Sequence, residues 1–293
     1  MSKYVVAKLT SEMIGEERSE IMKAKATTTK TDVIVACSCV LLFAYLCGIT
    51  SCGRRQAPEQ AKRAVCTNNL KMLTLAWIMY ADENDDKIVN GMAGRDREQD
   101  GIVIEKAWTG RDWADGYEAG AQLPEQSQEQ AITSGALFPY LKAAKLYRCP
   151  NGVPGQIRTY SIVDSMNGVP RPRTQEDGAW ANKRMDLQNP PPARRLVLVD
   201  VGRATPDSFA VHYDKEQWWA LPPIRHGDGT TVSFADGHAE YWNWTGSETV
   251  TLGKSIDRGS SPKDVVPKTL DGKEDLHRFQ TAVWGKLGYT PSS

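Results

Sequence analysis

The sequence predicts an α+β fold in which a long N-terminal helix, apolar first and amphipathic after, packs on a small antiparallel β-sheet with large loop insertions. Three observations support this prediction. Residues 33–50 carry no charge. Residues 58–80 place apolar side chains at the i, i+3, i+4, i+7 spacing of one helix face. Residues 230–235 alternate apolar and polar side chains before an Asp-Gly turn, and residues 238–244 form the return strand.

The composition excludes an electrostatic role for the chain as a whole. Acidic and basic residues balance at 36 each among 293 residues, so no overall field attracts nucleic acid, and we expect no nucleic-acid partner. The 9 Trp, 24 Gly and 16 Pro predict loops held in place by aromatic side chains. We expect a polar segment at 1–31, a transmembrane or signal segment at 32–52, an amphipathic helix at 53–83 and a globular domain at 84–293.

The apolar segment leaves two interpretations open. As a helix, residues 33–50 would be about 27 Å long, which is close to the hydrocarbon thickness of a bilayer. A retained segment would make the chain a single-pass inner-membrane protein. Alternatively, the sequence before Cys52 is typical of a lipoprotein signal, above all if translation begins at Met22, and Cys52 would then carry the lipid. A buried core helix is disfavoured because the run has no polar stripe.

The helix that follows has a clear start and end. Pro58 suits the first turn, Glu59 suits the positive end of the helix, and the acidic residues 82–86 end it. The side chains that we expect to face the rest of the domain are Val65, Asn69, Met72, Leu73, Ala76, Met79 and Tyr80.

The globular part contains two β signals after a large insertion at about 84–190. Residues 196–199 are a short apolar run and predict a buried strand. Asp236 and Gly237 predict a two-residue hairpin turn, because Gly tolerates positive φ and Asp tolerates it better than most residues. In this register Ala235 lies opposite His238.

Several segments resemble one protein family. They are Ala64–Lys71, Tyr80–Asp85, the G-x-L-x-P-Y-L stretch at 135–141 with Cys149-Pro150, and His226 placed nine residues before Asp236-Gly237. Together they resemble the type II secretion pseudopilins, and more narrowly the prepilin-like proteins with a C-terminal H-x9-D-G motif.

The resemblance implies a pilin-like fold and a non-enzymatic, membrane-anchored structural subunit or accessory of a type II secretion or type IV pilus-related system. Its implied partners are the inner membrane, further copies of itself or other pseudopilins through the N-terminal helix, and secretion-system components. The globular domain would lie on the periplasmic or outer side. The chain departs from the family at Lys30 and Val35, near the places of a Gly and a Glu in the prepilin signal. Processing by a prepilin peptidase and incorporation into a pilus are therefore unsupported.

The segment around the H-x9-D-G motif offers candidate metal ligands. His226, Asp228, Asp236 and His238 are suitable ligand types for zinc or a similar divalent ion. In the competing structural interpretation, Asp236 and Gly237 shape the turn and His226 makes a hydrogen bond. Acidic loop residues are also candidates for calcium, although none has the EF-hand spacing; they are Asp82, Asp85, Asp86 and Asp228.

Two further features bear on function. Cys66 and Cys149 form either one disulfide in an exported domain or two free buried thiols. The chain has no G-x-S-x-G and no H-E-x-x-H motif, so we predict a protein without enzymatic activity. The alternatives are an exported lipoprotein binding module anchored at Cys52 and, less favoured, an exported metal-dependent hydrolase that uses His226, Asp236 and His238.

Overall fold

A computed structural model describes residues 58–116, 120–256 and 263–292. The chain divides into two compact units, residues 1–58 and 59–293, and the second unit contains the sheet and the sites considered below. Its architecture is α+β, with two antiparallel sheets in the described part of the chain.

The main sheet has four antiparallel strands in the order β3-β4-β5-β6. They are β3 (Tyr160–Ile162), β4 (Leu196–Asp200), β5 (Gly229–Phe234) and β6 (Ala239–Asn243). The strand predicted at 196–199 is β4. Every residue of β4 and β5 is buried, because helices cover the sheet on both sides.

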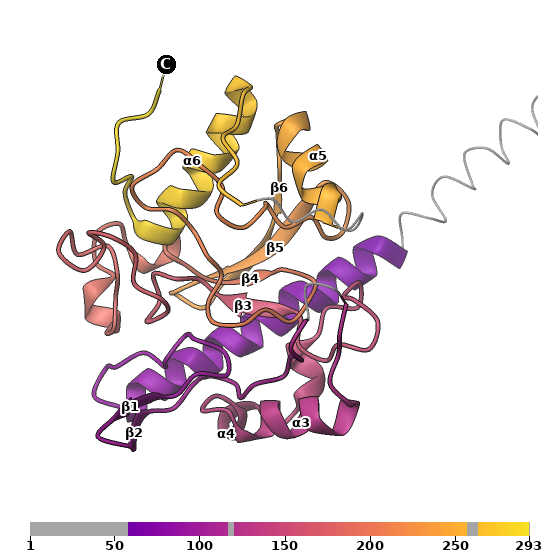
Figure 1. Ribbon diagram of the computed structural model, residues 1–293, viewed down its shortest axis with the longest axis vertical. Helices are drawn as coiled ribbons and strands as arrows, with labels where there is room; N and C mark the ends of the chain where they lie inside the picture. Colours follow the sequence, from indigo (N-terminus) through magenta and orange to yellow (C-terminus); the bar gives the residue numbers. More distant parts are fainter. Residues whose placement is uncertain (1–57, 117–119, 257–262, 293) are drawn as a thin grey trace, which may run out of the picture. The chain divides into compact units, whose positions relative to one another are not determined.

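The helix of residues 58–83 lies on one side of this sheet, and α5 (Ser247–Ser255) and α6 (Leu270–Trp284) lie on the other (Figure 1). On the first side, Thr74 donates a hydrogen bond to Ser233 (2.7 Å). On the second side, the ring of Phe279 in α6 packs against Trp242 and Trp244, with centroid distances of 6.4 and 5.9 Å. Aromatic side chains thus fill the core between the sheet and α6.

The insertion before the central strands folds into short elements. They are the two-stranded sheet β1 (Arg97–Gln99) and β2 (Ile102–Glu105), the helices α3 (Glu125–Ser134) and α4 (Phe138–Leu141), and the 3₁₀ helices η2 (Ala144–Tyr147), η3 (Arg184–Asp186) and η4 (Pro192–Arg194).

The buried face of helix 58–83 differs from the predicted one. Val65, Met72 and Met79 were expected in the core, but they are 47%, 38% and 47% exposed. The fully buried side chains lie one position further along the helix and include Cys66, Leu70, Leu73, Trp77 and Ala81. The prediction was wrong because the helix is apolar on both faces, so spacing alone does not choose between them.

The hairpin register also differs from the prediction by one residue. Ser233 pairs with Ala239, and the backbone N–H of Phe234 donates to the carbonyl of His238 (2.9 Å). The loop therefore contains three residues, 235–237, and not two. Such a loop needs one residue in the left-handed region, and Gly237 supplies it with φ of +96°.

The structure corrects the predicted fold class and location. None of the helices in the described ranges is long and apolar enough to cross a bilayer. This finding contradicts the pilin-like fold with a membrane-spanning helix and the single-pass inner-membrane location with a periplasmic domain. The helix of 58–83 carries exposed charged side chains along its length and buries one face on the sheet. The segment 32–52 and Cys52 lie outside the described residues.

Candidate metal centre

Four potential metal ligands from four separate segments meet between the helix of 58–83 and the main sheet. Cys66 lies on the helix, Cys149 follows η2, Asp200 is the last residue of β4, and His226 precedes β5. The side chains of the two cysteines and Asp200 are 0% exposed, and His226 is 2% exposed. One ligand atom from each residue lies within 4.8 Å of every other.

The local backbone explains how each side chain is aimed. A backbone turn follows Cys149, in which the Gly152 N–H donates to its carbonyl (2.9 Å). Asp200 is fixed where the Gly202 N–H donates to Oδ1 (3.0 Å), which leaves Oδ2 directed at Cys66. His226 has φ of +61°, and Arg63 donates to its carbonyl oxygen (2.9 Å). Such a conformation is uncommon for a residue other than Gly, and it marks this position as one held by its surroundings.

Nε2 of His226 is close to all three acidic groups. It lies 3.0 Å from Sγ of Cys66, 3.2 Å from Sγ of Cys149 and 3.7 Å from Oδ2 of Asp200. Sγ of Cys66 lies 3.4 Å from the same Asp200 oxygen. Tetrahedral zinc with sulfur, nitrogen and oxygen ligands separates its ligand atoms by roughly 3.3–3.8 Å. The four atoms thus already stand within a few tenths of an ångström of the edges of such a tetrahedron.

A second layer of hydrogen bonds orients these ligands. Nδ1 of His226 lies 2.8 Å from Oε1 of Glu59, which also accepts from Asn151 Nδ2 (2.7 Å). The hydroxyl of Tyr160 donates to Sγ of Cys66 (3.2 Å), and the backbone N–H of Asn151 donates to Sγ of Cys149 (3.3 Å). A carboxylate on the far nitrogen of a ligating histidine, and donors to the thiolates, are usual around protein metal sites.

The electrostatics of the cluster favour a cation at its centre. Burial alone would lower the pKa of His226, but hydrogen bonding to Asp200 and Cys149 outweighs it and raises the pKa to about 10. The hydrogen bond between the two thiols raises the pKa of Cys66 and lowers that of Cys149. The three acidic groups therefore stabilise a positive charge among them, here on the imidazole.

The cluster has the chemistry of a closed metal centre. Two thiolates, one imidazole and one carboxylate supply four ligands, which is the usual number for structural zinc. Soft sulfur ligands favour zinc and other thiophilic metals over calcium or magnesium, which prefer oxygen. Because all four ligands are protein side chains and all are buried, a tetrahedral ion here would have no position for substrate.

The other ligands suggested by the sequence do not join this cluster. Asp228 is exposed and pairs with Nζ of Lys254 (2.5 Å). Asp236 and His238 pair with each other at the tip of the hairpin, with Oδ1 and Nδ1 2.5 Å apart. Of the set His226, Asp228, Asp236 and His238, the structure places only His226 at the metal centre. Gly237 forms the hairpin turn, which is the structural role considered for it.

The acidic residues considered for calcium are engaged elsewhere. Arg184 pairs with Asp82 (2.6 Å) and with Asp86 (2.9 Å), which joins the end of helix 58–83 to η3. Asp85 has φ of +52° in the turn that ends the helix. Across the described ranges, the group of Cys66, Cys149, Asp200 and His226 is the one set of three or more such ligands close enough to share an ion.

The sequence singled out three of the four ligands but not as one site. Cys66 and Cys149 were considered only as a disulfide or as two thiols, and the structure carries both as free thiols. Asp200 was missed, although an acidic residue at the end of a wholly apolar strand is a signal of a functional role, because a buried charge needs a partner. Glu59 was seen only as a favourable residue for the helix start.

Comparison of the chain with family models, curated proteins and solved structures found no match in any of the three. The function is therefore argued from the cluster itself.

Proposed function

We propose that the chain is a non-enzymatic structural protein whose globular domain is locked by one zinc ion. The observation that carries this proposal is the buried tetrad of Cys66, Cys149, Asp200 and His226, with its ligand atoms within 4.8 Å of one another. The two thiolates and the carboxylate would neutralise the ion and leave one negative charge. Donors from Tyr160 and Asn151 offset that charge.

The role of the ion is to join segments that are distant in the chain. Cys66 and Asp200 are 134 residues apart, and Cys66 and His226 are 160 residues apart. A metal bound to both fixes the helix against the sheet, and its binding free energy adds to the stability of the folded state. A ligand at a concentration one hundred times its Kd contributes about 2.7 kcal/mol in this way.

The structural role is also consistent with the H-x9-D-G motif. Its His226 is a proposed metal ligand, and its Asp236 and Gly237 form the turn between β5 and β6. Neither end of the motif is placed to act on a substrate. We therefore retain, as part of the proposal, a pseudopilin-like subunit or accessory of a secretion or pilus-related system. Sedimentation of the full chain tests the subunit role, and a monomer at every concentration, with or without zinc, argues against it.

Elemental analysis of the full chain tests the metal centre. We expect one zinc per chain after purification without chelator, and less than one tenth of that in the double variant Cys66→Ser, Cys149→Ser. A matched control, Asp228→Asn with His238→Ala, removes the motif residues that lie outside the cluster and should retain full occupancy. A metal-free wild type after purification from zinc-supplemented cells would contradict the proposal. Copper or iron in place of zinc would keep the site and change the metal.

A further inference from the structure

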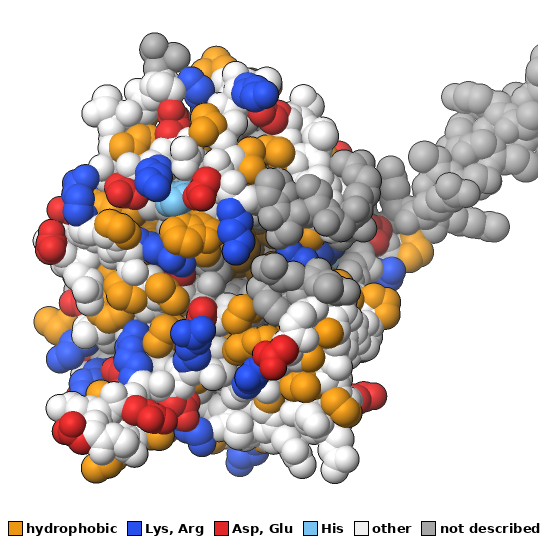
Figure 2. Space-filling model, in the orientation of Figure 1, with side chains coloured by type: hydrophobic (Ala, Val, Ile, Leu, Met, Phe, Trp, Pro, Cys, Tyr) orange, Lys and Arg blue, Asp and Glu red, His pale blue; other side chains and the backbone are white. Residues whose placement is uncertain are grey.

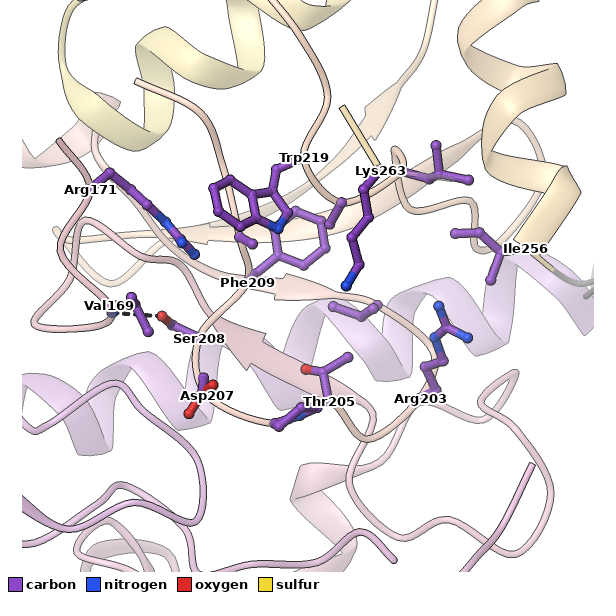
Figure 3. Close-up of a pocket in the computed structure, with 15 residues that line it drawn as sticks. Val169, Arg171, Arg203, Thr205, Asp207, Ser208, Phe209, Trp219, Ile256 and Lys263 are labelled. Atoms are coloured by element: carbon purple, nitrogen blue, oxygen red, sulfur yellow. Dashed lines mark hydrogen bonds between the residues drawn. The ribbon is translucent and has the colours of Figure 1, made fainter. Parts of the chain in front are cut away.

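A separate cavity lies on the opposite flank of the sheet from the metal centre's ligands, among the loops that follow β3 and β4 and the end of α5. Its volume is about 280 Å³. Phe209, Trp219 and Leu221 supply apolar walls, and Arg171, Arg203 and Lys263 supply positive charge (Figure 3). Hydrophobic and basic side chains lie next to one another around a hollow in the middle of this face (Figure 2). None of these six residues belongs to the metal centre.

The charge in this cavity is positive. Among the lining residues, Asp207 is the single acid that faces the three basic side chains within the described ranges, and it pairs with Arg95 (2.6 Å). Lys263 has no ion-pair partner among the residues that the structure describes, and its amino group is drawn pointing into the cavity (Figure 3). An anion that enters therefore meets positive charge that acidic neighbours do not cancel.

Arg171 is held in place before any ligand arrives. Its Nε lies 2.5 Å from Oδ2 of Asp164, which is completely buried. Asp164 is itself fixed by the hydroxyl of Ser208 (2.6 Å) and the backbone N–H of Val211 (3.0 Å). This arrangement uses one edge of the guanidinium, and its two terminal nitrogens make no hydrogen bond to the described residues. They remain available as a fixed pair of donors.

An aromatic wall stands beside that donor pair. The guanidinium carbon of Arg171 lies 4.1 Å from the centroid of the Trp219 ring. Phe209 is 4% exposed and forms the floor. A flat apolar group can therefore pack on Trp219 and Phe209 while an attached anion reaches the guanidinium edge. The volume is at the lower end of the range for ligand pockets, roughly 300–1000 Å³, which indicates a single-ring ligand.

We propose that this cavity binds a small aromatic carboxylate. The ring would pack against Trp219 and Phe209, and the planar carboxylate would accept two hydrogen bonds from the terminal nitrogens of Arg171. Lys263 and Arg203 would add positive charge at the open side. This binding site is independent of the zinc ion and goes beyond the structural role proposed above.

Isothermal titration of the full chain with benzoate tests the proposal. We expect benzoate to bind with one site per chain, in the micromolar to low millimolar range. Benzamide has the same shape without the charge and should bind at least about tenfold more weakly, which corresponds to about 1.4 kcal/mol. Phenyl phosphate tests the other class of anion. Equal binding of benzamide, tighter binding of phenyl phosphate, or no benzoate binding at all would each overturn the assignment.

Variants locate the site. Lys263→Gln should weaken benzoate binding several-fold, and Arg171→Lys should weaken it about tenfold because it keeps the charge and loses the fork. Lys71→Gln removes an exposed lysine on the helix of 58–83 and should leave binding unchanged. If Arg171→Lys does not fold, Trp219→Leu replaces it and should also weaken binding. Unchanged affinity in both Lys263→Gln and Trp219→Leu would place the benzoate elsewhere and refute the proposal.

Discussion

The imidazole of His226 joins Cys66 to Glu59, with Nε2 3.0 Å from Sγ and Nδ1 2.8 Å from Oε1. Cys66 and Glu59 are seven residues apart on one helix, so they lie on the same face about two turns from each other. One ring thus contacts a proposed ligand and the carboxylate that orients it, both on the element that a metal would fix to the sheet.

Removing one thiolate should destabilise the domain mainly through the lost metal. In Cys66→Ser we expect the thermal midpoint to fall by several degrees and to stop responding to a zinc chelator. Differential scanning calorimetry with and without chelator measures both effects. In the wild type, chelator should lower the midpoint toward that of the variant. A midpoint that is insensitive to chelator in the wild type would argue against a structural ion.

Glu59→Gln should weaken zinc binding about 10–100-fold while the domain stays folded, because a second-layer carboxylate orients its histidine and increases the basicity of the ring. Glu59 is partly exposed, so the substitution does not open the core. Competition with a fluorescent zinc chelator measures the change. Glu129→Gln, on the exposed side of α3, is the matched control and should bind zinc like the wild type.

Zinc binding should release protons and tighten as the pH rises. The pKa of His226 is raised to about 10, so below that pH the imidazole carries a proton that zinc must displace. The raised pKa of Cys66 adds a second proton. At pH 8 we expect about two protons per zinc, since the pKa of Cys149 is lowered. Titration calorimetry in buffers of different ionisation enthalpy counts them. Affinity that does not change between pH 7 and 9 would contradict this linkage.

The sequence identified those elements whose pattern is local. The run at 196–199 and the alternation at 230–235 predicted β4 and β5, because a strand buried on both faces or on one leaves a direct mark in the residue order. The helix of 58–83 was also visible, but its buried face was not. Met72 and Met79 fit the helical spacing as well as Leu70 and Trp77 do, and only packing against the sheet decides between them.

The metal centre could not be assembled from the sequence because its ligands are far apart in the chain. The sequence analysis grouped His226 with Asp228, Asp236 and His238, which are neighbours in sequence. In the structure, β5 runs from the buried end near His226 to an exposed hairpin tip, so Asp236 and His238 lie at the other end of the strand. The true neighbours of His226 come from other elements, and tertiary structure alone brings them together.

The hairpin turn should tolerate a side chain at Gly237 poorly. With φ of +96°, Gly237→Ala places an L residue in the left-handed region, which costs about 1–2 kcal/mol. Its new Cβ would also lie 3.3 Å from Cδ1 of Ile78. Gly101→Ala is the matched control, because Gly101 has φ of +75° with no heavy atom within 4 Å of the added Cβ. Urea unfolding should show a larger loss for Gly237→Ala, and unchanged zinc content in both variants.

The ion pair of Arg158 and Asp112 should show the largest effect of any charged pair tested. Both side chains are 0% exposed, with Nε 2.6 Å from Oδ2 and Nη2 2.8 Å from Oδ1. Arg158→Met leaves the carboxylate buried without its partner, which costs about 3–5 kcal/mol. Urea unfolding measures the loss, and Arg158→Met combined with Asp112→Leu should recover part of it. Arg111→Met breaks the exposed pair with Asp115 and should cost less than about 1 kcal/mol. Similar losses for the two arginine variants would show that the buried charge is satisfied in another way.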